Sequence, residues 1–225
     1  MINILKSQPA PDCLAIEKQK ANGNYNCGDV LTRLKADFHN KCYLCEDKGL
    51  TTLNTEHFVA HQGDIDLKFD WNNLFFACGH CNNTKSNRYG NLLNCTNSSI
   101  KITDLLQFKA SGIPKEHLEV TATQETPLIE IQNTVALINA IYSGTTLLKE
   151  IESENLRDKV TKEVAYFTEY LRDFYFEYGL SDDEKEVIKA KIRRRLSPES
   201  PFTAFKIWII KSNAHLLRDF GHFLI

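Results

Sequence analysis

Apolar positions follow one pattern in the first part of the chain and a different one in the rest. Residues 1–30 are polar and interrupted by prolines and glycines, which predicts an extended N-terminal arm or loop. Residues 30–38 predict a short helix that begins after Asp29. The short apolar runs at 52–58 and 74–78 predict two strands with a loop between them, and residues 81–88 predict a second short helix.

Beyond a polar stretch at residues 94–100, apolar residues recur at helical spacing. The spacing covers residues 128–139, 147–178 and 202–220, and Ser181 with the acidic residues after it predicts the start of a further helix. We therefore predict an N-terminal arm at 1–30, a compact module at 31–98 and a helical domain at 99–225. The fold class expected is α+β, with a small module inside a predominantly α-helical protein.

Composition adds little to this picture. Charged residues make up 25% and hydrophobic residues 42% of the 225 positions, which are ordinary values for a globular protein. The formal net charge of −2 offers no general attraction for nucleic acid, so such binding would need a local basic patch or a partner. No signal peptide and no long apolar span is evident, and a cytosolic protein that does not contact membranes is expected.

Four cysteines form two C-x2-C pairs, Cys42 with Cys45 and Cys78 with Cys81. Four thiolates suffice for a closed tetrahedral zinc site, which would stabilise the fold rather than catalyse. The alternative is four separate cysteines in an apolar core, which the polar residues around the first pair disfavour. The remaining cysteines have no matching spacing and are expected to be ordinary buried or half-buried thiols; they are Cys13, Cys27 and Cys95.

Polar residues between and after these pairs predict a second metal site. Glu56 and His57 stand at the end of a predicted strand, and Asn82 directly follows the last cysteine at the start of a predicted helix. A carboxylate and an amide oxygen suit a hard divalent cation such as Mg2+. His57 beside that cation would be placed to take a proton from an attacking water, because its pKa lies near operating pH.

The motifs at residues 38–90 resemble the zinc-supported HNH (ββα-metal) endonucleases. More narrowly, they are similar to the HNH subunit of Septu-type anti-phage systems, and comparable HNH proteins accompany an ATPase in some retrons. The resemblance implies that His57 is the general base, that Glu56 and Asn82 hold the catalytic cation, and that Asn73 fixes the loop and orients the base. Asn82 stands where the family often has histidine, which favours an oxygen-liking metal.

Two basic residues follow Asn82 at helical spacing. Lys85 lies one predicted turn beyond it and Arg88 one turn beyond Lys85, so both are expected to clamp flanking phosphates. A solvated lysine and a structural salt bridge are the respective alternatives. His61, four residues after His57, and His80, inside the second cysteine pair, are not promoted to ligands.

The resemblance implies a metal-dependent endonuclease that hydrolyses phosphodiester bonds, with DNA favoured and RNA, including tRNA, left open. It also implies an ATPase partner that docks on the helical domain in a defence complex, and a retron reverse transcriptase with its RNA and DNA as a further possible partner. Two rival hypotheses are a zinc-ribbon module that binds nucleic acid without catalysis, and an adaptor in which only the helical part acts.

A basic run and an aromatic run in the helical part can each be interpreted in two ways. A basic run could be a phosphate-binding stripe or a solvated face balanced by nearby acids; it comprises Lys185, Lys189, Lys191, Arg193, Arg194 and Arg195. An aromatic run from Tyr166 to Tyr178 is wider than one core stripe needs, so part of it could form a protein interface, with core packing as the default.

Overall fold

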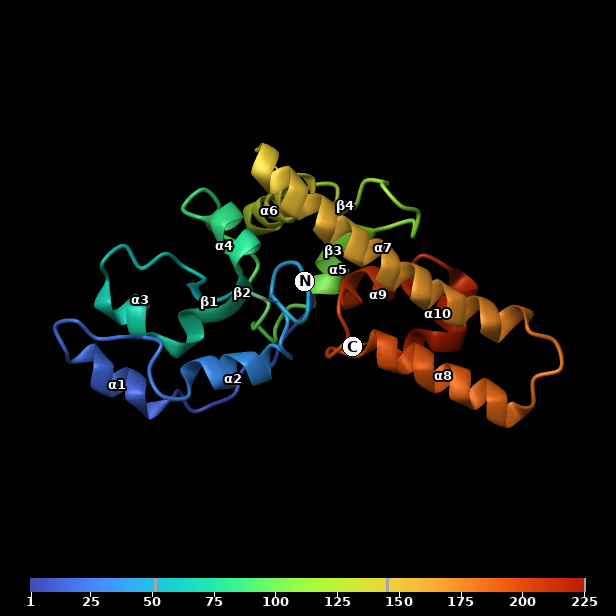
Figure 1. The fold of residues 1–225 in the computed structure, drawn as a ribbon, viewed down its shortest axis with the longest axis horizontal. Coiled ribbons are helices and arrows are strands. Elements are labelled where there is room, and N and C mark those ends of the chain that lie inside the picture. Colours follow the sequence, from blue (N-terminus) through green and yellow to red (C-terminus); the bar gives the residue numbers. More distant parts are fainter. Residues whose placement is uncertain (51, 145, 225) are drawn as a thin grey trace.

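The computed structural model describes residues 1–50, 52–144 and 146–224. Figure 1 shows the first half of the chain gathered around a two-stranded sheet and the second half forming a helical layer beside it, with the long helix α7 running from the top of the view diagonally down to the right. The architecture is the predicted α+β fold, in which a small ββα module belongs to a mainly helical protein.

The module is built from two antiparallel strands and the helices that flank them. Strand β1 (Leu53–His57) pairs with β2 (Leu74–Cys78), and α4 (Gly79–Lys85) follows β2 without a loop. Helix α2 (Val30–Asp37) packs against β2, whose five residues are all buried. These elements confirm the predicted strands and helices, although α4 ends at Lys85, earlier than expected.

Several elements of the first half were not predicted. They are α1 (Asp12–Lys18), α3 (Ile65–Phe69) and the 3-10 turn η1 (Trp71–Asn73). Residues 1–30 contribute buried side chains to the core, including Met1, Ile2 and Leu14, so this segment packs against the module. The prediction that Cys13 and Cys27 are free thiols was wrong, because they form a disulfide. A sequence separation of 14 carries no spacing signal for such a bond.

The second half begins with a short hairpin and continues as helices. Its elements are α5 (Ile102–Leu105), β3 (Leu106–Lys109), β4 (Glu119–Ala122), α6 (Ile129–Ser143), α7 (Leu147–Phe176), α8 (Asp182–Leu196), α9 (Thr203–Lys211), α10 (Ala214–Phe220) and η2 (Gly221–Phe223). The capping box of Ser181 and Glu184 confirms the predicted start of α8. The final helical stretch is two helices, because Asn213 caps a new helix with its side chain. In the described part of the chain, no helix has the length and apolar character needed to cross a membrane.

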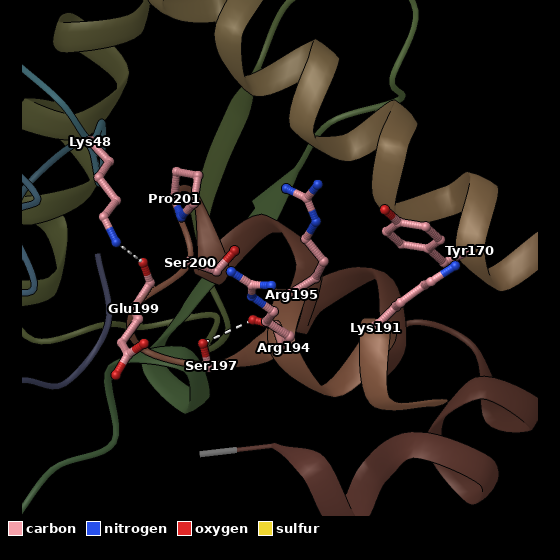
Figure 2. A pocket seen from close by; sticks show the side chains of 9 residues that line it. All are labelled: Lys48, Tyr170, Lys191, Arg194, Arg195, Ser197, Glu199, Ser200 and Pro201. Atoms are coloured by element: carbon pink, nitrogen blue, oxygen red, sulfur yellow. Dashed lines mark hydrogen bonds between the residues drawn. The ribbon is translucent and has the colours of Figure 1, made fainter. Parts of the chain in front are cut away.

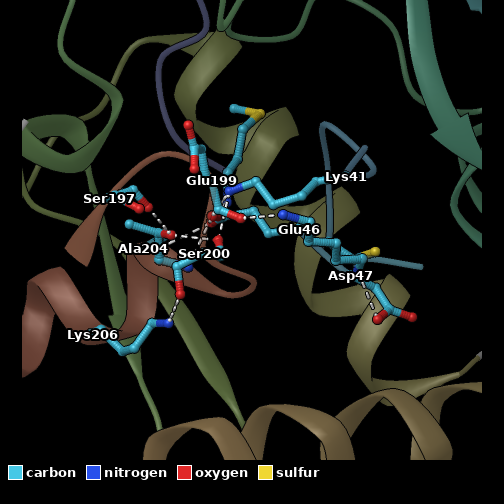
Figure 3. A network of polar contacts seen from close by, with 12 residues as sticks. Lys41, Glu46, Asp47, Ser197, Glu199, Ser200, Ala204 and Lys206 are labelled. Atoms are coloured by element: carbon cyan, nitrogen blue, oxygen red, sulfur yellow. Dashed lines mark hydrogen bonds and ion pairs between the residues drawn. The ribbon is translucent and has the colours of Figure 1, made fainter. Parts of the chain in front are cut away.

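A polar seam joins the first cysteine pair to the helical layer. The Lys48 ammonium donates to the carbonyl oxygen of Glu199 at 2.8 Å, as Figure 2 shows. The Glu46 carboxylate accepts from the backbone amides of Thr203 at 2.9 Å and Ala204 at 3.2 Å, at the start of α9, and pairs with Lys41 at 3.3 Å (Figure 3). The two halves are therefore held together by buried charge and not only by apolar packing.

Candidate metal centre and active site

The four predicted cysteine ligands meet in one buried cluster. Each pair of Sγ atoms among Cys42, Cys45, Cys78 and Cys81 lies within 4.8 Å, and the Sγ atoms of Cys45 and Cys78 are 3.9 Å apart. Four sulfurs at about 2.3 Å from one tetrahedral zinc ion are separated by about 3.8 Å. The cluster therefore fits a structural Zn2+ with a closed thiolate shell, as the sequence predicts.

The second cysteine pair also sets the position of helix α4. Cys78 ends β2, and its sulfur accepts a hydrogen bond from the amide of Cys81 at 3.4 Å, which caps the helix. The backbone at Gly79 passes close to β1, since a Cβ there would lie 3.2 Å from Thr52 Oγ1. Helix α4 thus starts against the sheet. The backbone position of Asn82 is set by Cys81, the member of the cysteine cluster that directly precedes it.

A cavity of about 350 Å³ lies between β1 and α4. It brings together the three residues on which the predicted metal site depends, Glu56, His57 and Asn82. The complete lining is Tyr25, Thr55, Glu56, His57, Ala60, His61, Gln62, Asn82, Lys85, Ser86 and Asn87. The juxtaposition expected from the sequence is present, while the catalytic role of each residue stays a prediction.

The His57 ring is held with one nitrogen free. Nε2 lies 3.0 Å from the carbonyl oxygen of Lys68. A carbonyl can only accept, so Nε2 carries the proton and Nδ1 keeps its lone pair. Rings of Tyr25 and His61 contact His57 at centroid distances of 4.7 and 4.8 Å. Burial lowers the pKa of His57, so the imidazole is neutral near pH 7 and able to accept a proton.

Asn73 fastens the segment between the two strands. Its Oδ1 accepts from the Val59 amide at 2.7 Å, and its Nδ2 donates to the carbonyl oxygens of Val59 at 2.9 Å and Leu67 at 3.0 Å. Leu67 precedes Lys68, the residue whose carbonyl holds His57. The amide therefore links the loop after β1 to the backbone that orients the imidazole.

Glu56 and Lys85 form a buried ion pair at the base of the cavity. Glu56 Oε1 lies 2.5 Å from Lys85 Nζ, and both side chains are about 95% buried, with exposed fractions of 4% and 5%. Lys85 Nζ also donates to the carbonyl oxygen of His57 at 3.1 Å. Lys85 therefore points inward, whereas the sequence predicts an outward phosphate contact or a solvated side chain. Burial raises the pKa of Glu56, and the Lys85 ammonium opposes that shift.

The remaining oxygen donors suit a hard cation. Among the described residues, Glu56 Oε2 is buried with no hydrogen-bond partner, and the Asn82 side chain makes no hydrogen bond. A carboxylate oxygen and an amide oxygen that face one polar cavity are ligands that Mg2+ accepts, with water completing the shell. The donor set therefore fits the divalent cation that was predicted.

Arg88 is not part of this cavity. Helix α4 stops at Lys85 because Ser86 adopts a positive φ of 40°, so Arg88 does not continue the helical face and its side chain is exposed. Conversely, the cavity includes Tyr25 and His61, which sequence reasoning missed or declined. The spacing of His61 from His57 was a usable signal, whereas nothing in the sequence places Tyr25 here.

His80 has a structural position rather than a metal-binding one. Its Nδ1 lies 2.8 Å from Glu152 Oε2 on α7, and its Nε2 lies 2.8 Å from the carbonyl oxygen of Ile141 on α6. Helix α4, which carries Asn82, is therefore tied to both helices of the second half.

Residues 42–88 match the family model of the HNH endonucleases. The chain therefore carries an HNH endonuclease domain over this segment, which contains the cysteine cluster and both walls of the cavity. A comparison with curated proteins finds no match. An HNH domain indicates a metal-dependent nuclease, and this finding disfavours the hypothesis of a module that only binds nucleic acid.

Proposed function

We propose that the protein is a metal-dependent endonuclease that hydrolyses phosphodiester bonds, with DNA as the favoured substrate. One observation carries the proposal: a buried carboxylate with a free oxygen shares a cavity with an imidazole whose Nδ1 is unprotonated. Lys85 pairs with one oxygen of this carboxylate, but Oε2 is buried without a hydrogen-bond partner, which is costly, and a bound cation would satisfy it. The match to the HNH family over the same residues supports this reading.

In this proposal each residue has a separate task. His57 Nδ1 takes the proton of a water that attacks the scissile phosphorus. Asn73 keeps the ring in place through the loop it binds. Glu56 and Asn82 hold the divalent cation, which when bound neutralises charge on the leaving 3′ oxygen. Lys85 balances Glu56 in the absence of that cation.

The experiment is cleavage of labelled DNA and RNA pools by His57→Ala, with and without Mg2+. We expect loss of cleavage with unchanged zinc content and unchanged circular dichroism. His215→Ala is the matched control, since His215 is exposed on α10 and does not line the cavity. Cleavage by His57→Ala at the wild-type rate would remove the general base from the scheme.

We also propose that the nuclease is the effector of an anti-phage complex with an ATPase, which docks on the helical part. The resemblance to Septu-type subunits suggests this role, and exposed aromatic side chains at the end of α7 support a protein interface: Phe176 is 70% and Tyr178 100% exposed. Co-expression with a candidate ATPase of a Septu-type system should yield a co-purifying complex. Phe176→Ser with Tyr178→Ser should abolish co-purification, and retention of the complex by this variant would argue against that surface.

A further inference from the structure

The basic run on α8 divides into two groups in the structure. Lys189 pairs with Glu186 at 2.6 Å and Arg195 with Glu163 at 2.7 Å. Among the described residues, the other four members of the run form no ion pair; they are Lys185, Lys191, Arg193 and Arg194. The interpretation as a balanced, solvated face therefore applies to only part of the run.

Two of these four unpaired cations, Lys191 and Arg194, line a second cavity of about 370 Å³. Figure 2 shows Arg194 extending from α8 toward Ser200, and Lys191 beside the ring of Tyr170 on α7. The lining is Lys48, Tyr170, Lys191, Arg194, Arg195, Ser197, Glu199, Ser200 and Pro201. It holds four cationic side chains and a single carboxylate, and it shares no residue with the HNH cavity.

Several lining residues of this basic pocket are held in place by hydrogen bonds and ion pairs of their own. Ser200 is buried, and it accepts from Lys41 at its carbonyl oxygen (2.8 Å) and from Lys206 at its hydroxyl (2.6 Å). Arg195 is anchored by Glu163, and Lys48 by the carbonyl oxygen of Glu199. These contacts hold Ser200, Arg195 and Lys48 in place without a ligand. Lys191 and Arg194 have no such contacts and can bind one.

We propose that the basic pocket binds backbone phosphates of the nucleic acid, as a second contact of the substrate away from the HNH cavity. The proposal rests on the proposed function. Two free cations in a polar, preformed pocket match the charge of a phosphodiester. The HNH cavity itself supplies little attraction, because its lysine, Lys85, is neutralised by Glu56 and Arg88 lies outside it. With a net charge of −2, the protein needs such a local site to hold a polyanion.

The kinds of side chain in the lining favour a strand of nucleic acid over a free nucleotide. The pocket offers one aromatic face, Tyr170, whose ring centroid lies 5.6 Å from Lys191 Nζ and 5.8 Å from the Arg195 guanidinium. Its remaining walls are charged and hydroxyl side chains plus Pro201, with no apolar slot for a base. Recognition would therefore be by charge and be independent of sequence.

The test measures binding of a fluorescein-labelled DNA duplex across a range of salt concentrations, with all variants in a His57→Ala background so that no cleavage occurs. Lys191→Gln with Arg194→Gln removes two phosphate contacts. Each contact contributes a slope of roughly 0.9 to the dependence of log K on log salt. We expect the slope to fall by about 2, and by about 1 for each single variant.

The matched control is Lys185→Gln with Arg193→Gln. It removes the same charge from the same helix at side chains that are equally exposed but lie outside the pocket. A much smaller change of slope for this control supports a local site. Equal changes for the two double variants would show attraction by diffuse charge and would overturn the pocket, as would an unchanged slope for the Lys191 and Arg194 variant.

A second measurement separates a nucleic-acid strand from a small phosphate compound. Inorganic pyrophosphate is titrated into the zinc-loaded protein by calorimetry. Weak binding that is lost in the pocket variant, together with the change in DNA slope, supports the proposal. Pyrophosphate binding with DNA affinity insensitive to Lys191→Gln and Arg194→Gln would overturn the strand as ligand. Failure of the nuclease proposal is seen separately, as undiminished cleavage by His57→Ala.

Discussion

Replacement of Glu46 by glutamine tests the polar seam between the cysteine cluster and the helical layer. The carboxylate is 2% exposed and receives four donors: Lys41, the N-terminal amine, and the amides of Thr203 and Ala204. Burial opposes its ionisation, but the N-terminal ammonium and Lys41 outweigh this and lower the pKa of Glu46 to about 2. Glutamine keeps the shape, turns one acceptor into a donor, and leaves the Lys41 and N-terminal ammonium groups without a counter-charge.

The expected loss of stability depends on whether Lys41 keeps its proton. Breaking a buried ion pair costs about 3–5 kcal/mol. Lys41, which is 1% exposed, limits this cost by losing its proton. Deprotonating a lysine with an ordinary pKa near 10.4 costs about 5 kcal/mol at pH 7 and about 2 kcal/mol at pH 9. Burial already lowers the pKa of Lys41 and Glu46 opposes that shift, so removal of Glu46 lowers the pKa further.

The protonation of Lys41 also sets how the stability of the Glu46→Gln variant depends on pH. In the variant, the unfolded state binds more protons than the folded state at pH values between the lowered folded pKa and the unfolded pKa. Stability of the variant therefore rises with pH in that window. We expect Glu46→Gln to lower the free energy of unfolding by about 3–5 kcal/mol at pH 7, and the deficit to shrink by about 2 kcal/mol or more at pH 9.

The assay is urea unfolding of the zinc-loaded protein at both pH values. Glu154→Gln serves as the control, because Glu154 is exposed on α7 and should change stability by less than about 0.5 kcal/mol. Lys41→Met combined with Glu46→Gln should recover part of the loss, since one of the two unpaired charges is gone. A deficit below about 1 kcal/mol, or one that is the same at pH 7 and pH 9, would refute the reasoning.

Three further predictions concern the HNH domain. Lys85→Met should lower stability by about 3 kcal/mol without added metal, because it leaves Glu56 buried and unpaired. In thermal unfolding, millimolar Mg2+ should reduce that loss of stability. An equal loss with Mg2+ would argue against Glu56 as a ligand. Because burial lowers the pKa of His57, kcat/KM should fall only as pH drops below about 6.5, and an acid limb above that value would contradict it. Cys81→Ser should reduce bound zinc, measured by mass spectrometry, and unfold the ββα module, whereas Cys95→Ser should leave the zinc content unchanged.

The features predicted correctly from sequence are those with a strict local period or spacing. The C-x2-C pairs predicted the cluster because thiolate spacing is a direct consequence of tetrahedral coordination, and the apolar runs predicted β1 and β2. Helix α3 was missed because its cap, Asp64, lies among residues that read equally well as a loop. The inward position of Lys85 depends on the burial of Glu56, which is set by the sheet register and not by neighbouring residues.

Long-range pairings account for the rest of the difference. Tyr25 reaches His57 from a segment 32 positions earlier, and Cys13 in α1 bonds to Cys27 in the loop that follows that helix. The basic pocket needs side chains from α7, from α8 and the residues that follow it, and from Lys48, so no window of sequence contains it. The 99–225 boundary stays a prediction, because the helical part is tied to the module by Glu46 and His80.

The attachment of His80 has a mechanical consequence. Helix α7 is 30 residues long, a stiff rod of about 45 Å whose near end is gripped by the ring of His80 and whose far end carries exposed aromatic side chains. A tilt of α7 would therefore either move α4 with it or break the hydrogen bond between His80 and Glu152. A partner that binds the far end of α7 would in this way act on His80, two residues before Asn82.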